Sequence, residues 1–388
     1  MADFERIEHP RDLEALAREL RRESILAVDT EADSFYHYFD KTCLVQLATR
    51  RNIYLVDPIA MGGPEELAPL GSLMESTSIR KIFHAAEYDI YVLKRDCGFR
   101  FGNLFDTMVS AQLLGYPSIG LSALAERHFD VKLPKDEQRS DWSVRPLRDS
   151  QLTYAAADVT HLIPLAEKLE AELRKASRLG WAQKEFEALS RREWPEREFD
   201  RLGYLRIKGA RSLPPEGLSV LRELYLVRDR RAREIDRPPF KVLGNRALLE
   251  IAEAQPTTDK ALAEIKGVSE LILRRFGREI LTAVERGQAK KHGPIPKRLN
   301  GGGVPRRRMD RRTERRLTDL KRWRSKRARD LEIDPGVLCP NSALEAIAWA
   351  DPQSANELSG LPEVKAWFAE SFGGEVVEAL RSAAQEES

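Results

Sequence analysis

Short apolar runs separated by polar turns characterise the first part of the chain. Residues 25–28, 43–48 and 53–57 are such runs, and a further run at 81–84 is followed by segments with helical apolar spacing. Runs this short favour buried strands over helices. Their order predicts three antiparallel strands and then alternating helices and strands. We therefore expect an α/β domain with a mixed sheet over residues 1–175.

The second half of the chain has a different pattern, which is helical and repeats itself. Asn245 recurs as Asn341, and apolar positions around it recur at the same spacing of 96 residues. Self-similarity at a fixed spacing indicates copies of one module. We predict two small all-α helical bundles, over residues 215–290 and 313–388.

Two linkers complete the predicted organisation. Residues 176–214 contain proline breaks and end before Pro215, which suits a connection between domains. Residues 291–312 are basic and contain three glycines at 301–303 together with three prolines. Such a composition is typical of a flexible linker.

The charge of the chain is unevenly distributed. The 388 residues carry a formal net charge of only +2. Residues 290–329 contain 17 lysines and arginines against three acids, a local balance of +14 that leaves −12 for the remainder. A basic block of this kind suits a polyanion such as nucleic acid, whose counterions it displaces. A solvated linker followed by a charged helix is the alternative explanation.

Composition also limits the class of protein. No apolar stretch approaches the length of a membrane span, and the N-terminus lacks the apolar core of a signal peptide. The three cysteines (Cys43, Cys97 and Cys339) lack the paired spacing of a disulfide framework or a zinc site. We therefore expect a cytoplasmic protein with no membrane partner.

Four acidic residues and a tyrosine lie in settings that suit phosphodiester chemistry. Asp29 and Glu31 follow the apolar run 25–28, and side chains two apart on a strand share a face. Tyr154 and Asp158 are one turn apart in an alanine-rich stretch that is expected to be helical. Each pair is therefore predicted to point its side chains in one direction.

The fourth acid, Asp89, follows the run 81–84 and is expected to open the next helix. Taken singly, acids in such positions are common on solvated surfaces. Together they would repel one another unless divalent cations lay between them. Two such ions about 4 Å apart stabilise the attacking and leaving oxygens of a displacement at phosphorus. The residues alone thus indicate metal-assisted hydrolysis of a phosphodiester.

Three motifs built on these residues resemble those of a known family. They are Val28-Asp29-Thr30-Glu31, Phe83-His84-Ala85 followed by Asp89, and Tyr154-Ala-Ala-Ala-Asp158. With them, residues 5–175 resemble the 3′–5′ exonuclease domain of the DEDD superfamily, in the subgroup whose third motif carries a tyrosine. Within that subgroup the chain most resembles the ribonuclease D family. The resemblance implies a ribonuclease H-like fold.

The resemblance also implies a role for each of the five residues. Asp29, Glu31 and Asp158 would hold one metal ion, and Asp29 would bridge to a second. Asp89 would complete the second site through water, and Tyr154 would orient the attacking water. The implied cofactors are two Mg²⁺ or Mn²⁺ ions, which prefer hard oxygen ligands.

A polar loop before Tyr154 and one histidine are candidates for substrate binding. Arginine and aromatic side chains beside an acidic site can hold phosphates and stack on the bases of a single strand. For His84, a buried or capping role is an equal alternative. We expect Trp142 to anchor the loop and Asp106 to cap the helix that follows it. The candidate substrate-binding residues are His84, Gln138, Arg139 and Arg145.

Both helical copies resemble the HRDC (helicase and ribonuclease D C-terminal) domain, a small bundle that assists nucleic-acid binding. The copy at 215–290 resembles it more closely, and the copy at 313–388 is more divergent. The second copy could bind nucleic acid, or it could be a structural cap that closes the domains around the catalytic face.

The combined expectation is a metal-dependent 3′–5′ exoribonuclease that releases 5′-mononucleotides. Its implied partners are tRNA precursors and other structured RNAs with single-stranded 3′ ends, and no small-molecule cofactor is expected. The preference for RNA and the 3′–5′ direction come from the resemblance. A DNA 3′–5′ exonuclease and an inactive nucleic-acid adaptor are the alternatives, and the complete set of motif residues argues against the adaptor.

Overall fold

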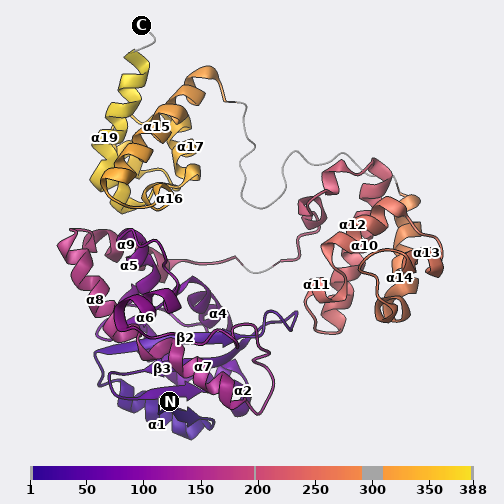
Figure 1. The fold of residues 1–388 in the computed structure, drawn as a ribbon, viewed down its shortest axis with the longest axis horizontal. Coiled ribbons are helices and arrows are strands. Elements are labelled where there is room, and N and C mark those ends of the chain that lie inside the picture. The colour runs from indigo at the N-terminus through magenta and orange to yellow at the C-terminus, as the bar shows by residue number, and fades with distance from the viewer. Residues whose placement is uncertain (1–2, 196–197, 291–308, 386–388) are drawn as a thin grey trace. The chain divides into compact units, whose positions relative to one another are not determined.

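The computed structural model describes residues 3–195, 198–290 and 309–385 (Figure 1). Contacts divide these residues into two compact units. The first unit contains residues 3–32, 41–194 and 309–385. The second unit contains residues 33–40, 195 and 198–290. Most of the predicted linker 291–312 lies outside the described residues.

A six-stranded mixed sheet lies in the first unit, with the strand order β1-β4-β3-β2-β5-β6. The strands are β1 (Glu5–Ile7), β2 (Ile25–Ala32), β3 (Thr42–Ala48), β4 (Ile53–Val56), β5 (Arg80–Phe83) and β6 (Leu104–Asp106). β2, β3 and β4 pair in antiparallel fashion, and the remaining pairs are parallel. The predicted mixed sheet with its antiparallel start is confirmed. β1 and β6 are additional strands, because three residues are too few to form a recognisable apolar run.

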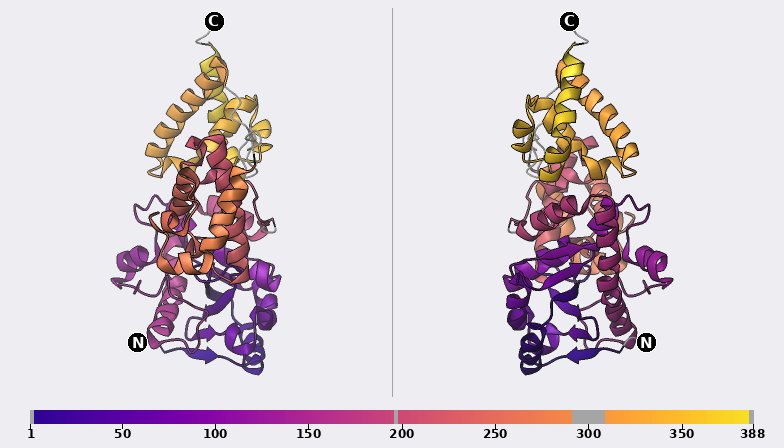
Figure 2. Two further views of the ribbon diagram at one scale, coloured as in Figure 1. Left: turned by 90° about the vertical axis from the view of Figure 1, so that its right-hand side faces the viewer. Right: turned by 90° about the vertical axis from the view of Figure 1, so that its left-hand side faces the viewer.

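Helices flank this sheet, as the side views show (Figure 2). They cover strands whose residues are largely buried, and in β3 every residue is buried. The helices of the N-terminal part are α1 (Pro10–Leu20), α2 (Pro58–Met61), α3 (Gly71–Glu75), α4 (Glu87–Cys97), α5 (Thr107–Leu113), α6 (Leu121–Phe129), α7 (Asp149–Thr160), α8 (Leu162–Lys175) and α9 (Leu179–Arg191), with the 3-10 helix η1 (Pro64–Leu70).

Helix α9 lies inside the segment 176–214, which the sequence pattern predicts to be a linker. Its side chains Ala182 and Phe186 are buried, and Phe186 lies against Phe105 of β6 with ring centroids 4.9 Å apart. The proline breaks on which the prediction rested come only after this helix ends. The helix thus belongs to the core of the first unit because its apolar side chains cover the edge strand.

The two predicted helical bundles share one architecture. The first consists of α10 (Pro215–Glu234), α11 (Pro239–Val242), α12 (Asn245–Ala254), α13 (Asp259–Ala263) and α14 (Glu270–Gln288), and is preceded by η2 (Gly203–Arg206) and η3 (Ala210–Ser212). The second consists of α15 (Arg311–Asp330), α16 (Pro335–Leu338), α17 (Asn341–Ala350), α18 (Ala355–Ser359) and α19 (Ala366–Gln385). Each helix of the second bundle begins 96 residues after its counterpart, as the sequence repeat predicts.

One side-chain contact is repeated in both bundles. Arg228 donates a hydrogen bond from Nη1 to Asn245 Oδ1 over 2.7 Å, and a second one to a backbone carbonyl group. Arg324 donates in the same way to Asn341 Oδ1 over 2.9 Å and to the equivalent carbonyl group. The repeat therefore extends from helix positions to the polar contacts that join the first helix of each bundle to the third.

The structure bears on two further features of the sequence. None of the helices in the described part of the chain combines the length and the apolar character that a bilayer span requires. Cys43, Cys97 and Cys339 are free thiols, and two of them, Cys43 and Cys339, are buried. The thiols therefore contribute to packing rather than to covalent cross-links between these residues.

Candidate active site

Strand β2 and helix α7 bring three of the predicted carboxylates together. Asp29 and Glu31 lie two residues apart near the end of β2, after four buried residues. Because alternate side chains of a strand share a face, both carboxylates point the same way. Asp158 comes from α7, and one carboxylate oxygen from each of the three residues lies within 4.8 Å of the other two. These residues are a candidate set of metal ligands.

Helix α7 also carries Tyr154, one turn before Asp158 as predicted. Burial, and then the negative charge of Asp158, raise the pKa of the Tyr154 hydroxyl group. Its ring is 8% exposed and lies beside Trp142, with ring centroids 6.1 Å apart. Trp142 is itself buried, which agrees with the anchoring role expected for it. Tyr154 is therefore held by burial and by an aromatic contact along its side.

Asp89 lies in the first turn of α4 and is linked to β2 by a side-chain contact. Thr30, which lies between Asp29 and Glu31, donates from Oγ1 to Asp89 Oδ1 over 2.6 Å. Asp89 does not belong to the three carboxylates that lie within 4.8 Å of one another. Its negative charge nevertheless raises the pKa values of Asp29, Glu31 and Asp158. All four acids thus act on one another electrostatically.

Asp106 has a larger role than the helix cap predicted for it. Its Oδ1 accepts hydrogen bonds from two backbone amides in the first turn of α5, over 2.8 and 3.0 Å, which confirms the cap. The same carboxylate also accepts from the amides of Ala85 and Ala86, over 3.2 and 2.8 Å. Ala85 has a φ of 62°, in the left-handed region that disfavours a residue with a Cβ. Asp106 therefore stabilises the turn that leads into the helix of Asp89.

Burial and the negative charge of neighbouring carboxylates raise the pKa values of all four carboxyl groups. Loss of hydration is the largest cause in each case. The pKa values of Asp29 and Glu31 lie well above their usual range, and those of Asp89 and Asp158 rise to about 7. Hard oxygen donors that repel one another in this way fit a divalent cation, whose charge would offset the repulsion.

The contacts of His84 favour a structural role. Its Nδ1 lies 2.9 Å from Thr107 Oγ1, and that hydroxyl group donates to the carbonyl oxygen of Phe83 over 3.1 Å. The hydroxyl proton is thus engaged, so Thr107 accepts a hydrogen bond from the imidazole N–H. Burial lowers the pKa of His84 to about 4, which leaves the ring neutral at pH 7. A neutral ring has no positive charge with which to attract a phosphate.

The loop between α6 and α7 presents Gln138 and Arg139 at its surface. Glu137, between this surface and the core, is buried and accepts hydrogen bonds from Ser150 and Arg148, each over 2.7 Å. These contacts fasten the loop to the start of α7, the helix of Tyr154 and Asp158. The two predicted substrate-binding residues are therefore exposed on a loop that is attached to a helix of the site.

Arg145, in contrast, directs its hydrogen bonds to other groups of the protein. Its Nε and Nη2 donate to the two carboxylate oxygens of Asp57 over 2.6 and 2.7 Å. Its other donors reach the backbone carbonyl oxygens of Trp142, Val144 and Cys43, over 2.7, 2.9 and 2.7 Å. A guanidinium group has five N–H donors, so none is left for a phosphate. The structure thus departs from the predicted substrate contact, because this side chain anchors the loop to the sheet.

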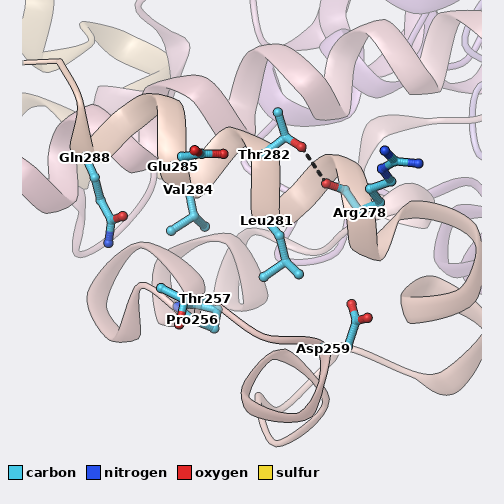
Figure 3. Close-up of a pocket in the computed structure, with 9 residues that line it drawn as sticks. All are labelled: Pro256, Thr257, Asp259, Arg278, Leu281, Thr282, Val284, Glu285 and Gln288. Atoms are coloured by element: carbon cyan, nitrogen blue, oxygen red, sulfur yellow. Dashed lines mark hydrogen bonds between the residues drawn. The ribbon is translucent and has the colours of Figure 1, made fainter.

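A hollow of about 560 Å³ lies in the first helical bundle, between α14 and the segment before α13 (Figure 3). Its lining mixes charged, polar and apolar side chains: Pro256, Thr257, Asp259, Arg278, Leu281, Thr282, Val284, Glu285 and Gln288. Within the described chain, Asp29, Glu31 and Asp158 form the only group of three such ligands close enough to share a metal ion. The hollow thus offers no comparable metal site, and the chemistry belongs to the acidic cluster.

Comparison with protein families covers both parts of the chain. Residues 4–174 match the family model of a 3′–5′ exonuclease. Residues 217–284 and residues 313–380 each match the HRDC domain. The first match contains all of the acidic cluster and Tyr154, and the other two coincide with the two helical bundles.

Individual relatives support the same grouping. The ribonuclease D of Gluconacetobacter diazotrophicus is 35% identical over 297 residues, which covers 76% of this chain and 75% of that protein. The ribonuclease D of Nitrobacter hamburgensis is 32% identical over 368 residues and covers 93% of this chain and 91% of that protein.

Solved structures agree with these relatives. Escherichia coli RNase D, described as an exoribonuclease involved in structured RNA processing, matches with a TM-score of 0.69 and 25% identity over 99% of both chains. The catalytic core of RRP6 from Trypanosoma brucei matches with a TM-score of 0.67 and 29% identity, over 74% of this chain and 80% of that one.

Proposed function

Because this chain belongs to the ribonuclease D family and is a 3′–5′ exoribonuclease, we propose that it trims 3′ extensions of structured RNAs such as tRNA precursors. The support is the role in structured RNA processing described for the Escherichia coli relative, together with two HRDC domains. The products would be 5′-mononucleotides. A DNA-specific exonuclease is not favoured, because the curated relatives are ribonucleases.

The observation that carries the proposed chemistry is the convergence of Asp29, Glu31 and Asp158 from two elements, with ligand atoms within 4.8 Å of one another. We propose that they hold one Mg²⁺ or Mn²⁺ ion, that Asp29 also contacts a second, and that Asp89 completes the second site. Bound ions of this kind lower the pKa of the attacking water and stabilise the leaving oxygen.

Tyr154 would position the attacking water by hydrogen bonding. Burial, and the carboxylates around it, raise the pKa of the Tyr154 hydroxyl group above its usual value, so it stays protonated at neutral pH. A protonated hydroxyl group can orient a water molecule but cannot remove its proton efficiently. Burial of the ring and its packing against Trp142 hold the side chain in place.

Exposed polar side chains near the acidic cluster are the candidates for contacts with the substrate. We propose that Gln138 and Arg139, which lie on the exposed loop before α7, contact the phosphates near the 3′ end. The exonuclease domain (residues 1–175) would perform hydrolysis, and the HRDC domains at 215–290 and 313–388 would hold the rest of the RNA.

A cytoplasmic location is consistent with three free cysteines.

The test is a cleavage assay on matched substrates. A hairpin RNA with a single-stranded 3′ tail and a DNA of the same sequence would be incubated with Mg²⁺, with Mn²⁺ or with EDTA. We expect 5′-mononucleotides to be released one at a time from the RNA tail, with either metal and not with EDTA. Equal release from the DNA would contradict the RNA assignment, and unchanged release in EDTA would contradict metal dependence.

A further inference from the structure

The first helices of the two HRDC domains occupy equivalent positions but differ in charge. Helix α15 of the second domain contains ten lysines and arginines against three acids, a balance of +7. Helix α10 of the first domain contains five arginines against four acids, a balance of +1. Between these two equivalent helices, the positive charge is therefore concentrated on α15 of the second HRDC domain, the copy that resembles HRDC less closely.

Three of the arginines of α15 make hydrogen bonds or ion pairs within the second HRDC domain. Arg324 donates to Asn341, Arg316 pairs with Asp351, and Arg327 pairs with Glu375 over 3.2 Å. These three arginines lie toward the side of α15 that packs against α17 and α19. Their role is to hold the bundle together, so they are not free to bind a ligand.

Four other basic residues form what we call the α15 basic face: Arg311, Arg322, Lys326 and Arg329, all of them exposed. Arg311, Arg322 and Arg329 are separated by 11 and 7 residues, close to three and two helical turns, so they lie in one row. The row extends over about 27 Å at 1.5 Å per residue. Arg322 has a carboxylate neighbour, Asp319 at 3.0 Å, whereas Lys326 has none within salt-bridge distance among the described residues.

The first HRDC domain has only part of this face. The positions 96 residues earlier are occupied by Pro215, Leu226, Arg230 and Arg233. Arg230 pairs with Glu279 over 3.3 Å, and Arg233 lies 3.6 Å from Asp229. The two domains thus share a fold, while the complete set of four exposed cations is specific to the second.

The α15 basic face lacks the side chains that recognise single strands. Proteins that bind single-stranded nucleic acid combine positive charge with exposed aromatic rings on which bases stack. The one aromatic residue of α15, Trp323, is half-buried and lies edge-on against Phe368 and Phe372, with centroids 5.9 and 6.3 Å apart. Charge without stacking suits the phosphate backbone of a double helix, whose bases are already paired.

The second HRDC domain is fastened to the exonuclease domain within the first unit. Trp181 of α9 stacks on Trp367 of α19, with centroids 4.8 Å apart, and the indole N–H of Trp367 donates to Glu185 over 2.5 Å. Arg178 donates to the carbonyl oxygen of Leu331, directly after α15, over 2.5 Å. These contacts fix the direction of α15 relative to the catalytic domain.

We propose that the second HRDC domain binds the double-helical body of the RNA substrate through the α15 basic face, while the 3′ tail is degraded at the acidic cluster. This inference rests on the proposed action on structured RNA. It assigns the duplex contact to the domain that resembles HRDC less, and to four named side chains of its first helix. The structural docking on α9 and the RNA contact are then two functions of one domain.

The test compares two triple variants of the full chain that remove the same charge. The first is Arg322→Gln, Lys326→Gln and Arg329→Gln on the α15 basic face. The matched control is Lys260→Gln, Lys266→Gln and Arg274→Gln, which neutralises three exposed cations of the first HRDC domain. Binding would be measured in EDTA at several salt concentrations, with a blunt RNA duplex, a hairpin with a 3′ tail, and the tail alone.

We expect the α15 variant to lose about tenfold in affinity for the duplex and the hairpin. The slope of log affinity against log salt concentration should become less negative by about 2 to 3, because each lost phosphate contact removes about 0.9 from the size of the slope. Turnover of the tail alone should be unchanged, which also shows that the variant is folded. Unchanged duplex binding, an equal loss in the control, or an equal loss on the tail would overturn the assignment.

The same measurements separate this inference from the proposed function. If the wild-type enzyme degrades the tail alone as well as the tailed hairpin, the proposed preference for structured RNA fails. If that preference exists and survives the α15 variant, only the assignment of the duplex contact fails.

Discussion

Thr30 donates a hydrogen bond from Oγ1 to Asp89 Oδ1 over 2.6 Å, and this bond joins β2 to α4 inside the acidic cluster. The two residues are 59 positions apart in the chain. Thr30 lies between Asp29 and Glu31, so one short segment provides two carboxylates and also holds a third. The bond lowers the pKa of Asp89 and so partly offsets the effect of its burial.

Replacing this threonine tests whether the bond matters for catalysis. Thr30→Val keeps the shape of the side chain and removes the donor, which leaves a buried carboxylate oxygen unpaired at a cost of about 1–3 kcal/mol. We expect turnover to fall about tenfold or more and the Mg²⁺ concentration for half-maximal activity to rise. Thr30→Ser retains the hydroxyl group and should recover most of the activity. Equal losses in both variants would mean that packing, rather than the hydrogen bond, is what matters.

Removing the Asp89 carboxylate should lower the activity and raise the stability of the metal-free protein. Asp89→Asn takes away a buried charge whose pKa is raised to about 7, mainly by burial. We expect activity to fall by at least about a hundredfold, while the metal-free protein gains on the order of 1–3 kcal/mol at pH 8. Thermal unfolding in EDTA measures the gain. A variant that is both inactive and less stable would show that Asp89 has a structural role instead.

Protons should compete with metal ions at this site. The pKa values of Asp89 and Asp158 are about 7, so below pH 7 each binds a proton that a cation must displace. The apparent affinity for Mg²⁺ should rise by up to about tenfold per pH unit for each proton displaced, from pH 5.5 to 7. Calorimetric titration with Mg²⁺ would measure this, and a flat profile would contradict the raised pKa values.

The same raised pKa values predict how the metal-free protein responds to pH. Between about pH 4 and pH 7 the four carboxyl groups of the acidic cluster bind more protons in the folded chain than in the unfolded chain, because burial raises their pKa values. Their contribution to the free energy of unfolding should therefore fall as the pH rises through this range. Urea unfolding in EDTA would show the trend, and saturating Mg²⁺ should weaken or reverse it.

Tyr154→Phe isolates the hydroxyl group that is proposed to orient water. The ring and its contact with Trp142 would remain, while the hydroxyl group beside the carboxylates would be lost. We expect turnover to fall about 10- to 100-fold, with Mg²⁺ binding changed little. The shape of the pH–rate profile should stay the same between pH 6 and 9, because the hydroxyl group does not ionise there. A changed alkaline limb would instead indicate that Tyr154 acts as a base.

Asp106 is predicted to support the site from outside it. Asp106→Ala removes a helix cap and leaves the amides of Ala85 and Ala86 without their acceptor. We expect a loss of about 2–4 kcal/mol in unfolding free energy, from the cap and the unpaired buried amides together. Asp106→Asn retains an acceptor oxygen and should lose less. Stability equal to wild type in the alanine variant would remove Asp106 from the support of Asp89.

Local spacing was enough to predict much of this protein. Asp29 and Glu31 share a face because a strand alternates with a period of two, and Tyr154 and Asp158 share one because a helix turns every 3.6 residues. The spacing of 96 residues from Asn245 to Asn341 likewise predicted two bundles of one architecture. Such features depend on backbone geometry over a few residues, or on comparison of the chain with itself.

Tertiary structure alone decided that Arg145 is a structural residue. Its sequence position in a polar loop suits a phosphate contact, yet all five of its N–H donors bond Asp57 and three backbone carbonyl groups. Helix α9 has an ordinary amphipathic pattern, but its contact with Trp367 depends on a domain that begins more than a hundred residues later. The physical reason is that desolvation and pairing depend on the elements packed around a side chain, and those elements come from distant parts of the chain.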